Sequence, residues 1–213
     1  MREILCFGDS NTYGLIPGTE NRFDRNTRWT GILDKHLYAK GYRIIEEGLC
    51  GRTTRFDDLT REGRNGAKML PILLETHTPI DRVILMLGTN DCKSCYDPSA
   101  ALIGRGVEML IEQIRKVDER IKILLISPIH LGEEVWKQEF DPEFDKDSIE
   151  ISKQLKDLYQ TIAQKYGCEF LAASDVAAPS REDQEHMDAA NHKKLAHLIQ
   201  EVIEADDYQE AIA

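Results

Sequence analysis

The sequence has no apolar run that approaches the ~18 consecutive residues of a membrane-spanning helix, so we expect no transmembrane segment. It also shows no secretion signal, because the apolar run near the N-terminus is short and lacks a cleavage-site pattern. Pro/Gly/Ser-rich linkers, low-complexity tracts and internal repeats are absent too, and 213 residues suffice for one sizeable core. We therefore expect a single domain over residues 1–213.

Basic residues are in the minority: 27 Lys and Arg stand against 38 Asp and Glu, for a formal net charge of −11. Nucleic-acid binding needs clustered Lys and Arg against phosphates, so we expect no nucleic-acid partner. Cysteine is sparse, and the odd count of five suits free thiols in a reducing compartment. We therefore expect a cytoplasmic protein in which Cys6 and Cys168, inside apolar runs, pack as small hydrophobes.

Five short apolar runs without strict alternation are typical of strands buried on both faces. They are residues 3–7, 42–47, 82–87, 122–127 and 168–173. Between them, apolar residues recur at helical spacing over 98–117, 149–166 and 195–202, with Asp97 the expected N-cap of the first of these helices and Pro98 in its first turn. Strands that alternate with helices predict an α/β fold with a parallel sheet of about five strands and helices on both faces.

Residues capable of catalysis follow the predicted strands. Ser10 comes three residues after the first apolar run, Gly51 follows the second, and Asn90 follows the third. Asp183 and His186 lie between the fifth run and the last helix. Because reactive groups in parallel sheets collect at the carboxyl ends of the strands, we expect these five residues to lie close together.

The same residues can perform acyl transfer. A serine hydroxyl needs an adjacent base, which His186 can supply while Asp183 orients its ring. The developing oxyanion needs donors, which the N–H groups of Ser10 and Gly51 and the amide of Asn90 can provide. Each short pattern also has an ordinary explanation as a turn, a helix cap or a chance spacing. Their joint occurrence in order at the strand ends favours an active site.

Four stretches resemble the four blocks of the SGNH, or GDSL-type, hydrolases: FGDSN (7–11), EGLCGRTT (47–54), LGTND (87–91) and DQEH (183–186). Further stretches resemble its arylesterase and acyltransferase branch, namely RWTG (28–31), IIEEGLCGRTT (44–54), NGAKMLP (65–71) and VILMLGTND (83–91). The resemblance runs from about Ile4 to the last helix. It implies a flavodoxin-like three-layer sandwich and a serine esterase that hydrolyses short-chain esters through an acyl-enzyme. Some members also transfer the acyl group to alcohols.

Position by position, the resemblance implies that Ser10 is the nucleophile, His186 the base and Asp183 its orienting carboxylate. It implies an oxyanion hole of Ser10, Gly51 and Asn90, a small-molecule ester as substrate, and no cofactor or metal. The G-x-S-x-G motif of α/β-hydrolases is absent, which disfavours that fold. One departure concerns Glu185, where the family often has an apolar residue. We expect its side chain to point to solvent, since turned inward it would raise the pKa of His186.

The candidates for the substrate pocket are Asp9, Trp29, Arg52 and His130. Three of them have an alternative that the sequence leaves open: Trp29 suits the core equally well, Arg52 suits a salt bridge, and His130 suits a position away from the site. The polar loop over 130–148, with three aromatic residues, suits a lid, a pocket wall or a contact between subunits of a homo-oligomer. An ordinary surface loop is its alternative.

Three other hypotheses compete with this interpretation. Cys92 and Cys95 form a C-x-x-C pattern that can hold zinc or exchange disulfides. No second ligand pair accompanies them, and acidic neighbours disfavour a reactive thiol, so a plain loop is expected. His192 is an alternative base, although its spacing from Asp188 suits a helix start. The alternative function is a non-catalytic or flavin-binding flavodoxin-like module.

Overall fold

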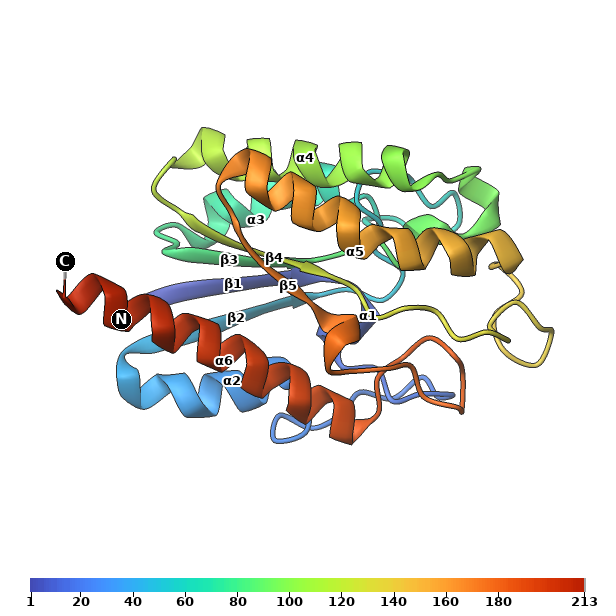
Figure 1. The fold of residues 1–213 in the computed structure, drawn as a ribbon, viewed down its shortest axis with the longest axis horizontal. Helices are drawn as coiled ribbons and strands as arrows, with labels where there is room; N and C mark the ends of the chain where they lie inside the picture. Colours follow the sequence, from blue (N-terminus) through green and yellow to red (C-terminus); the bar gives the residue numbers. More distant parts are fainter. Residues whose placement is uncertain (213) are drawn as a thin grey trace.

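A computed structural model describes residues 1–212 of the chain. Within this range, five parallel strands form one sheet in the order β2-β1-β3-β4-β5 (Figure 1). The strands are β1 (Arg2–Gly8), β2 (Tyr42–Gly48), β3 (Arg82–Met86), β4 (Lys122–Ser127) and β5 (Glu169–Ala172). Each begins and ends within one residue of its predicted run, and the predicted α/β fold class is confirmed.

Helices cover both faces of the sheet (Figure 1). On one face lie α3 (Gly66–His77), α4 (Ala100–Val117) and α5 (Lys146–Tyr166), and on the other lie α2 (Trp29–Leu37) and α6 (Ala189–Ile212). The described chain also contains four 3₁₀ turns: η1 (Tyr38–Lys40), η2 (Asn90–Cys92), η3 (Ser94–Tyr96) and η4 (Ala173–Asp175). None of the helices within residues 1–212 is both long enough and apolar enough to span a membrane.

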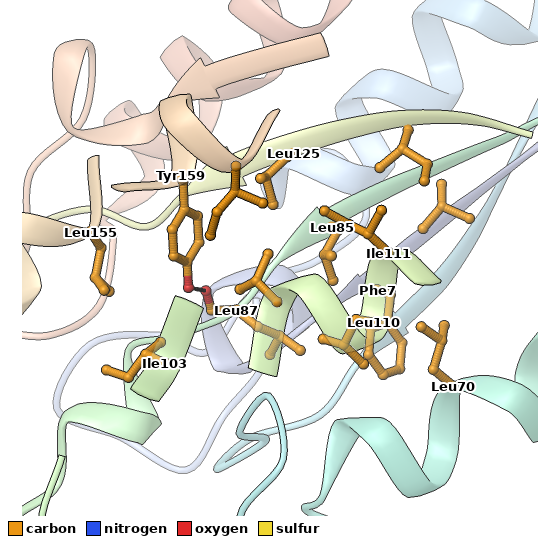
Figure 2. Packing of buried hydrophobic residues seen from close by; sticks show 14 of the residues in the cluster. Phe7, Leu70, Leu85, Leu87, Ile103, Leu110, Ile111, Leu125, Leu155 and Tyr159 are labelled. Carbon is orange, nitrogen blue, oxygen red and sulfur yellow. Dashed lines mark hydrogen bonds between the residues drawn. The ribbon is translucent and has the colours of Figure 1, made fainter. Parts of the chain in front are cut away.

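The sheet separates two hydrophobic cores, because successive side chains of a strand point to opposite faces. From β1, Leu5 and Phe7 pack among residues of α3, α4 and α5, whereas Ile4 and Cys6 pack against α2 and α6. Figure 2 shows the first core, in which Phe7 lies beside side chains of the covering helices. Both cores account for the continuous apolar runs seen in the sequence.

The start of α4 differs from the sequence prediction. Asp97 does not cap this helix, because its N–H closes the preceding turn η3 by donating to the Ser94 carbonyl and its backbone is left-handed, with φ 45°. The cap is Ser99, whose hydroxyl accepts the N–H of Leu102. The helix therefore begins two residues later than expected.

The register of the sheet aligns the loops that follow three neighbouring strands. Gly8 of β1 pairs with Gly48 of β2 on one side and with Met86 of β3 on the other. The short helix α1 (Ser10–Tyr13) packs closely against this edge, since a Cβ added to Gly48 would lie 2.1 Å from the backbone nitrogen of Tyr13. The three loops thus leave the sheet at one level, which brings residues distant in sequence together.

Candidate active site

Ser10 is the first residue of α1, directly beyond β1. The carboxylate of Asp9 caps this helix by accepting the Asn11 N–H at 2.9 Å, and Gly14, with φ 84°, ends it. The GDSN turn therefore becomes a single helical turn that carries Ser10 at its N-terminus. Only 3% of Ser10 is exposed.

His186 lies between Ser10 and Asp183. Its Nε2 is 2.8 Å from the Ser10 Oγ, and its Nδ1 is 2.7 Å from an oxygen of Asp183. Because a carboxylate only accepts, the Nδ1–H donates to Asp183, and in the neutral imidazole that catalysis requires Nε2 accepts from the Ser10 hydroxyl. Asp183 is held in turn by the N–H groups of His186 and Gly18, each at 2.9 Å. A serine, a histidine and a carboxylate thus form one hydrogen-bonded chain.

Asn11 holds the histidine loop against α1. Its Oδ1 accepts the Met187 N–H at 2.9 Å, and its Nδ2 donates to the Glu185 carbonyl at 3.4 Å. These two bonds hold the residues directly before and after His186. This role of Asn11 was not predicted from the sequence, although Asn11 belongs to the GDSN stretch (8–11).

Glu185 does not point to solvent as expected. Its side chain is only 8% exposed, and its Oε1 lies 3.8 Å from the His186 Nε2. Burial by itself would lower the pKa of His186, but the carboxylates of Glu185 and Asp183 outweigh it and raise that pKa to about 9. Burial would raise the pKa of Asp183, yet the hydrogen bonds from His186 lower it below its usual value.

Gly51 and Asn90 follow β2 and β3 at the same edge. Within residues 1–212, neither the Ser10 N–H nor the Gly51 N–H donates to any acceptor in the protein. Asn90 donates one amide hydrogen to the Arg52 carbonyl at 3.2 Å, which leaves its second amide hydrogen available. Gly51 has φ +82°, a conformation that favours glycine. At this edge of the sheet, three donors therefore have no acceptor within the described chain: the N–H groups of Ser10 and Gly51 and one amide hydrogen of Asn90.

Buried contacts hold these loops together. Asp91 accepts both the N–H and the hydroxyl of Thr54, which ties the loop after β3 to the loop after β2. Burial raises the pKa of Asp91 to about 7. On the other side, the Tyr159 hydroxyl of α5 donates to the Leu87 carbonyl at 2.8 Å (Figure 2). The position of Asn90 is therefore set by α5 as well as by the sheet.

The family model described as the GDSL-like lipase/acylhydrolase family matches residues 6–201. The chain belongs to this family. It is accordingly a serine ester hydrolase whose substrates are small-molecule esters, and the alternative of a flavin-binding module is not supported.

Solved structures of esterases are similar over nearly the whole chain. A carbohydrate acetylesterase from Sinorhizobium meliloti is 36% identical with a TM-score of 0.88, covering 96% of this chain and 99% of that chain. An inhibitor-bound aryl esterase from M. smegmatis is 33% identical with a TM-score of 0.90, again covering 96% and 99%. No curated protein matches the chain in sequence at a significant level.

The four pocket candidates of this GDSL-type hydrolase lie in different surroundings. Trp29 is fully buried in the core beneath α2 and donates its indole N–H to the Asn11 carbonyl. Arg52 donates to the carbonyls of Gly8 and Glu47 rather than to a carboxylate. Both side chains therefore support the backbone around α1.

The other two candidates do not line the cavity that adjoins His186. Asp9 is buried under α1, where burial raises its pKa to about 6. The charged groups acting on His130 are Lys153, Lys156 and Asp175, and it does not line the cavity beside His186. The structure therefore does not bring His130 to the catalytic residues.

A cavity of about 360 Å³ adjoins His186. Its lining includes Phe140 and Asp141 from the loop 130–148, together with Leu15, Thr19 and Glu185. Phe144 of the same loop packs into the core instead. One part of the loop thus forms a wall of the cavity and another part anchors it.

The rival residues are occupied elsewhere. His192 is fully buried and accepts the Trp29 N–H through its Nδ1, and burial lowers its pKa to about 4. Cys92 is buried and donates to the Gly88 carbonyl, whereas Cys95 is exposed; burial raises the pKa of both thiols. In the described part of the chain, no group of three His, Cys, Asp or Glu side chains could hold a metal ion.

Proposed function

We propose that Ser10 is the nucleophile of a short-chain carboxylic esterase. The observation that carries the proposal is the chain of two hydrogen bonds from Ser10 through His186 to Asp183, of 2.8 and 2.7 Å. His186 takes the hydroxyl proton through Nε2 as the Ser10 Oγ attacks the ester carbonyl. The ionised Asp183 keeps the proton on Nδ1 and stabilises the imidazolium that forms.

The N–H groups of Ser10 and Gly51 and the amide of Asn90 bind the oxyanion of the tetrahedral intermediate. The imidazolium then gives its proton to the leaving alcohol, and an acyl-enzyme remains on Ser10. Water, deprotonated by His186, attacks this ester in the same way and releases the acid. No step needs a metal or a cofactor.

The size of the site supports small substrates. The cavity beside His186 measures about 360 Å³, and another of about 430 Å³ adjoins Gly51. These volumes lie in the usual range of small-molecule sites. The aryl esterase and the carbohydrate acetylesterase that resemble this chain support the same substrate size.

Acyl transfer to an alcohol is a second reaction open to the same intermediate. The low exposure of Ser10 favours it, because an alcohol bound in the cavity competes better with water at a buried centre. The products of an ester and an added alcohol, separated chromatographically, measure the ratio of transfer to hydrolysis. An acid as sole product would exclude transfer.

We also propose a cytoplasmic location and no nucleic-acid partner. The five free thiols support a reducing, cytoplasmic compartment, and the net charge of −11 supports the absence of a nucleic-acid partner. A homo-oligomer remains a prediction that sedimentation of the purified protein would test.

The substitution Ser10→Ala tests the proposed nucleophile. We expect it to abolish turnover of p-nitrophenyl acetate and the mass increase caused by a fluorophosphonate, with the fold intact. Ser174→Ala is the matched control, because the Ser174 hydroxyl has no hydrogen-bond partner within the described chain. Retained turnover or labelling in Ser10→Ala would refute the assignment.

A further inference from the structure

Glu185 carries a buried carboxylate without a hydrogen-bond donor. Within residues 1–212 no backbone or side-chain group donates to its oxygens, although only 8% of its side chain is exposed. Asp183, two residues earlier, accepts from the His186 ring and from backbone N–H groups. Since a buried polar group is normally satisfied, the free oxygens of Glu185 indicate a position for a ligand.

Apart from His186, the cation whose charge acts on Glu185 is Lys93, and it is engaged elsewhere. The Lys93 ammonium pairs with Glu143 and lies 3.5 Å from an oxygen of Asp141. Asp183 already orients the His186 ring, so the triad has no need of a second carboxylate. Glu185 therefore lies beside the catalytic histidine, and its oxygens accept no hydrogen bond from the described chain.

The position of the Glu185 carboxylate relative to His186 determines which part of a substrate it contacts. His186 Nε2 returns its proton to the ester oxygen of the leaving alcohol, so this oxygen lies one hydrogen bond from Nε2. The Glu185 Oε1 is 3.8 Å from the same nitrogen and faces the cavity shared with Phe140 and Asp141. A hydroxyl on the carbon next to the ester-bearing carbon lies about one hydrogen-bond length from the leaving oxygen. It can therefore donate to Glu185.

We propose that Glu185 selects esters whose alcohol part carries a free hydroxyl next to the ester oxygen, as in partly acylated polyols and sugars. The inference rests on the proposed esterase function and adds a specificity-determining residue to it. The hydroxyl gives the buried carboxylate a hydrogen bond, whereas an alcohol without a neighbouring donor leaves it desolvated and without one.

The charge of the site favours a neutral hydroxyl over an ammonium group. Catalysis places a positive charge on His186, next to Glu185, in the transition state. An ammonium on the substrate would neutralise the carboxylate and repel this imidazolium, but a hydroxyl leaves the charge of Glu185 in place. An anionic alcohol part is disfavoured by Glu20, Asp141 and Glu185, which all line the cavity.

Matched acetates test the proposal. 2-Hydroxyethyl acetate and 2-methoxyethyl acetate share one skeleton, but only the first has a donor beside the ester oxygen; 2-aminoethyl acetate supplies the ammonium. We expect the wild-type kcat/KM for the hydroxy ester to exceed that for the methoxy ester about ten- to hundredfold, the usual range for a hydrogen bond to a charged group. We expect the amino ester to fall below the hydroxy ester.

Substitutions at Glu185 separate its hydrogen bond from its charge. Glu185→Leu should bring the ratio between hydroxy and methoxy esters close to one, whereas Glu185→Gln, which keeps a carbonyl acceptor, should retain part of it. Glu182→Leu, the same change at an exposed residue of the loop, should keep the wild-type ratio. Each ratio is taken between esters on the same protein at about pH 6.5, where the amino ester keeps its ammonium charge.

Three outcomes would overturn the proposal: equal wild-type rates on the hydroxy and methoxy esters, a preference for the amino ester, or an unchanged ratio in Glu185→Leu. The wild-type comparison decides even if Glu185→Leu fails to fold. Failure of the esterase function itself would look different, because neither turnover nor serine labelling would then depend on Ser10.

Discussion

At the scale of single residues, the proposed role of Asn90 predicts a direct effect on kcat. One of its amide hydrogens is bound to the Arg52 carbonyl, so Asn90→Ala removes one proposed oxyanion donor and one loop contact. We expect kcat to fall by about 10²–10³, with little change in KM, because the donor acts mainly on the transition state. Steady-state kinetics measure this, and urea unfolding shows whether the loop contact matters to the fold. An unchanged kcat would remove Asn90 from the oxyanion hole.

The second prediction concerns how kcat/KM depends on pH through His186. The carboxylates that face it are Asp183 and Glu185 from its own loop and Asp9 from the end of β1. With a pKa of about 9, His186 is protonated at neutral pH, so kcat/KM should rise with pH up to a midpoint near 9. Glu185→Gln removes one of the three negative charges and should move this midpoint to lower pH. The same midpoint in both proteins would contradict the electrostatic role of Glu185.

At the scale of elements, the catalytic turn depends on how closely α1 packs on β2. A Cβ at residue 48 would lie 2.1 Å from the backbone nitrogen of Tyr13, which cannot yield as a flexible side chain can. Gly48→Ala should therefore lower the free energy of unfolding by about 1–3 kcal/mol and reduce kcat by displacing Ser10. Urea unfolding and ester kinetics measure the two effects.

Gly104→Ala in α4 is the matched control for this change. Its Cβ would meet the ends of the flexible Leu158 and Ile162 side chains, and alanine has the higher helix propensity. Stability and rate should both stay close to the wild type. Equal behaviour of Gly48→Ala and Gly104→Ala would show that the close packing of α1 is unimportant.

The elements also differ in how far the sequence predicts them. The strands were found because their buried runs are continuous, and α4 and α5 because their apolar residues recur over several turns. Besides the single turn of α1, two helices were not predicted. The helix α2 spans only nine residues, and α3 contains Pro71 and has few buried positions, so neither has a long periodic pattern.

At the scale of the whole molecule, the titration of active-site groups should lower the free energy of unfolding at alkaline pH. The pKa of His186 is about 9 in the folded protein, above its ordinary value near 6.5, so its favourable contribution is complete below about pH 6.5 and is lost as pH rises through 9. Asp91, with a pKa raised by burial to about 7, acts in the same direction. His192, with its pKa lowered by burial to about 4, changes the free energy of unfolding between about pH 4 and its ordinary pKa near 6.5.

We therefore expect the urea midpoint to be lower at pH 9 than at pH 6.5, although the enzyme turns over faster at pH 9. Glu185→Gln should reduce the difference between the two midpoints, because His186 then binds its proton less tightly. Equal midpoints for the wild type at the two pH values would show that these groups do not control its stability.

The sequence by itself determined the sheet and the set of residues at its carboxyl edge. Continuous apolar runs can only be satisfied by burial on both faces, and a parallel sheet places the loop after each run at one edge. That is why Ser10, Gly51, Asn90 and His186 could be proposed from their positions alone.

Only the tertiary structure decided how the side chains of the loops and helix starts around this edge are oriented. Glu185 turns toward His186, Asn11 joins the two catalytic loops, and Trp29 lies in the core. Side chains in loops and in the first turn of a helix have no periodic pattern that assigns them to a face. Their direction depends on backbone hydrogen bonds and on the segments packed against them, which exist only once the chain has folded.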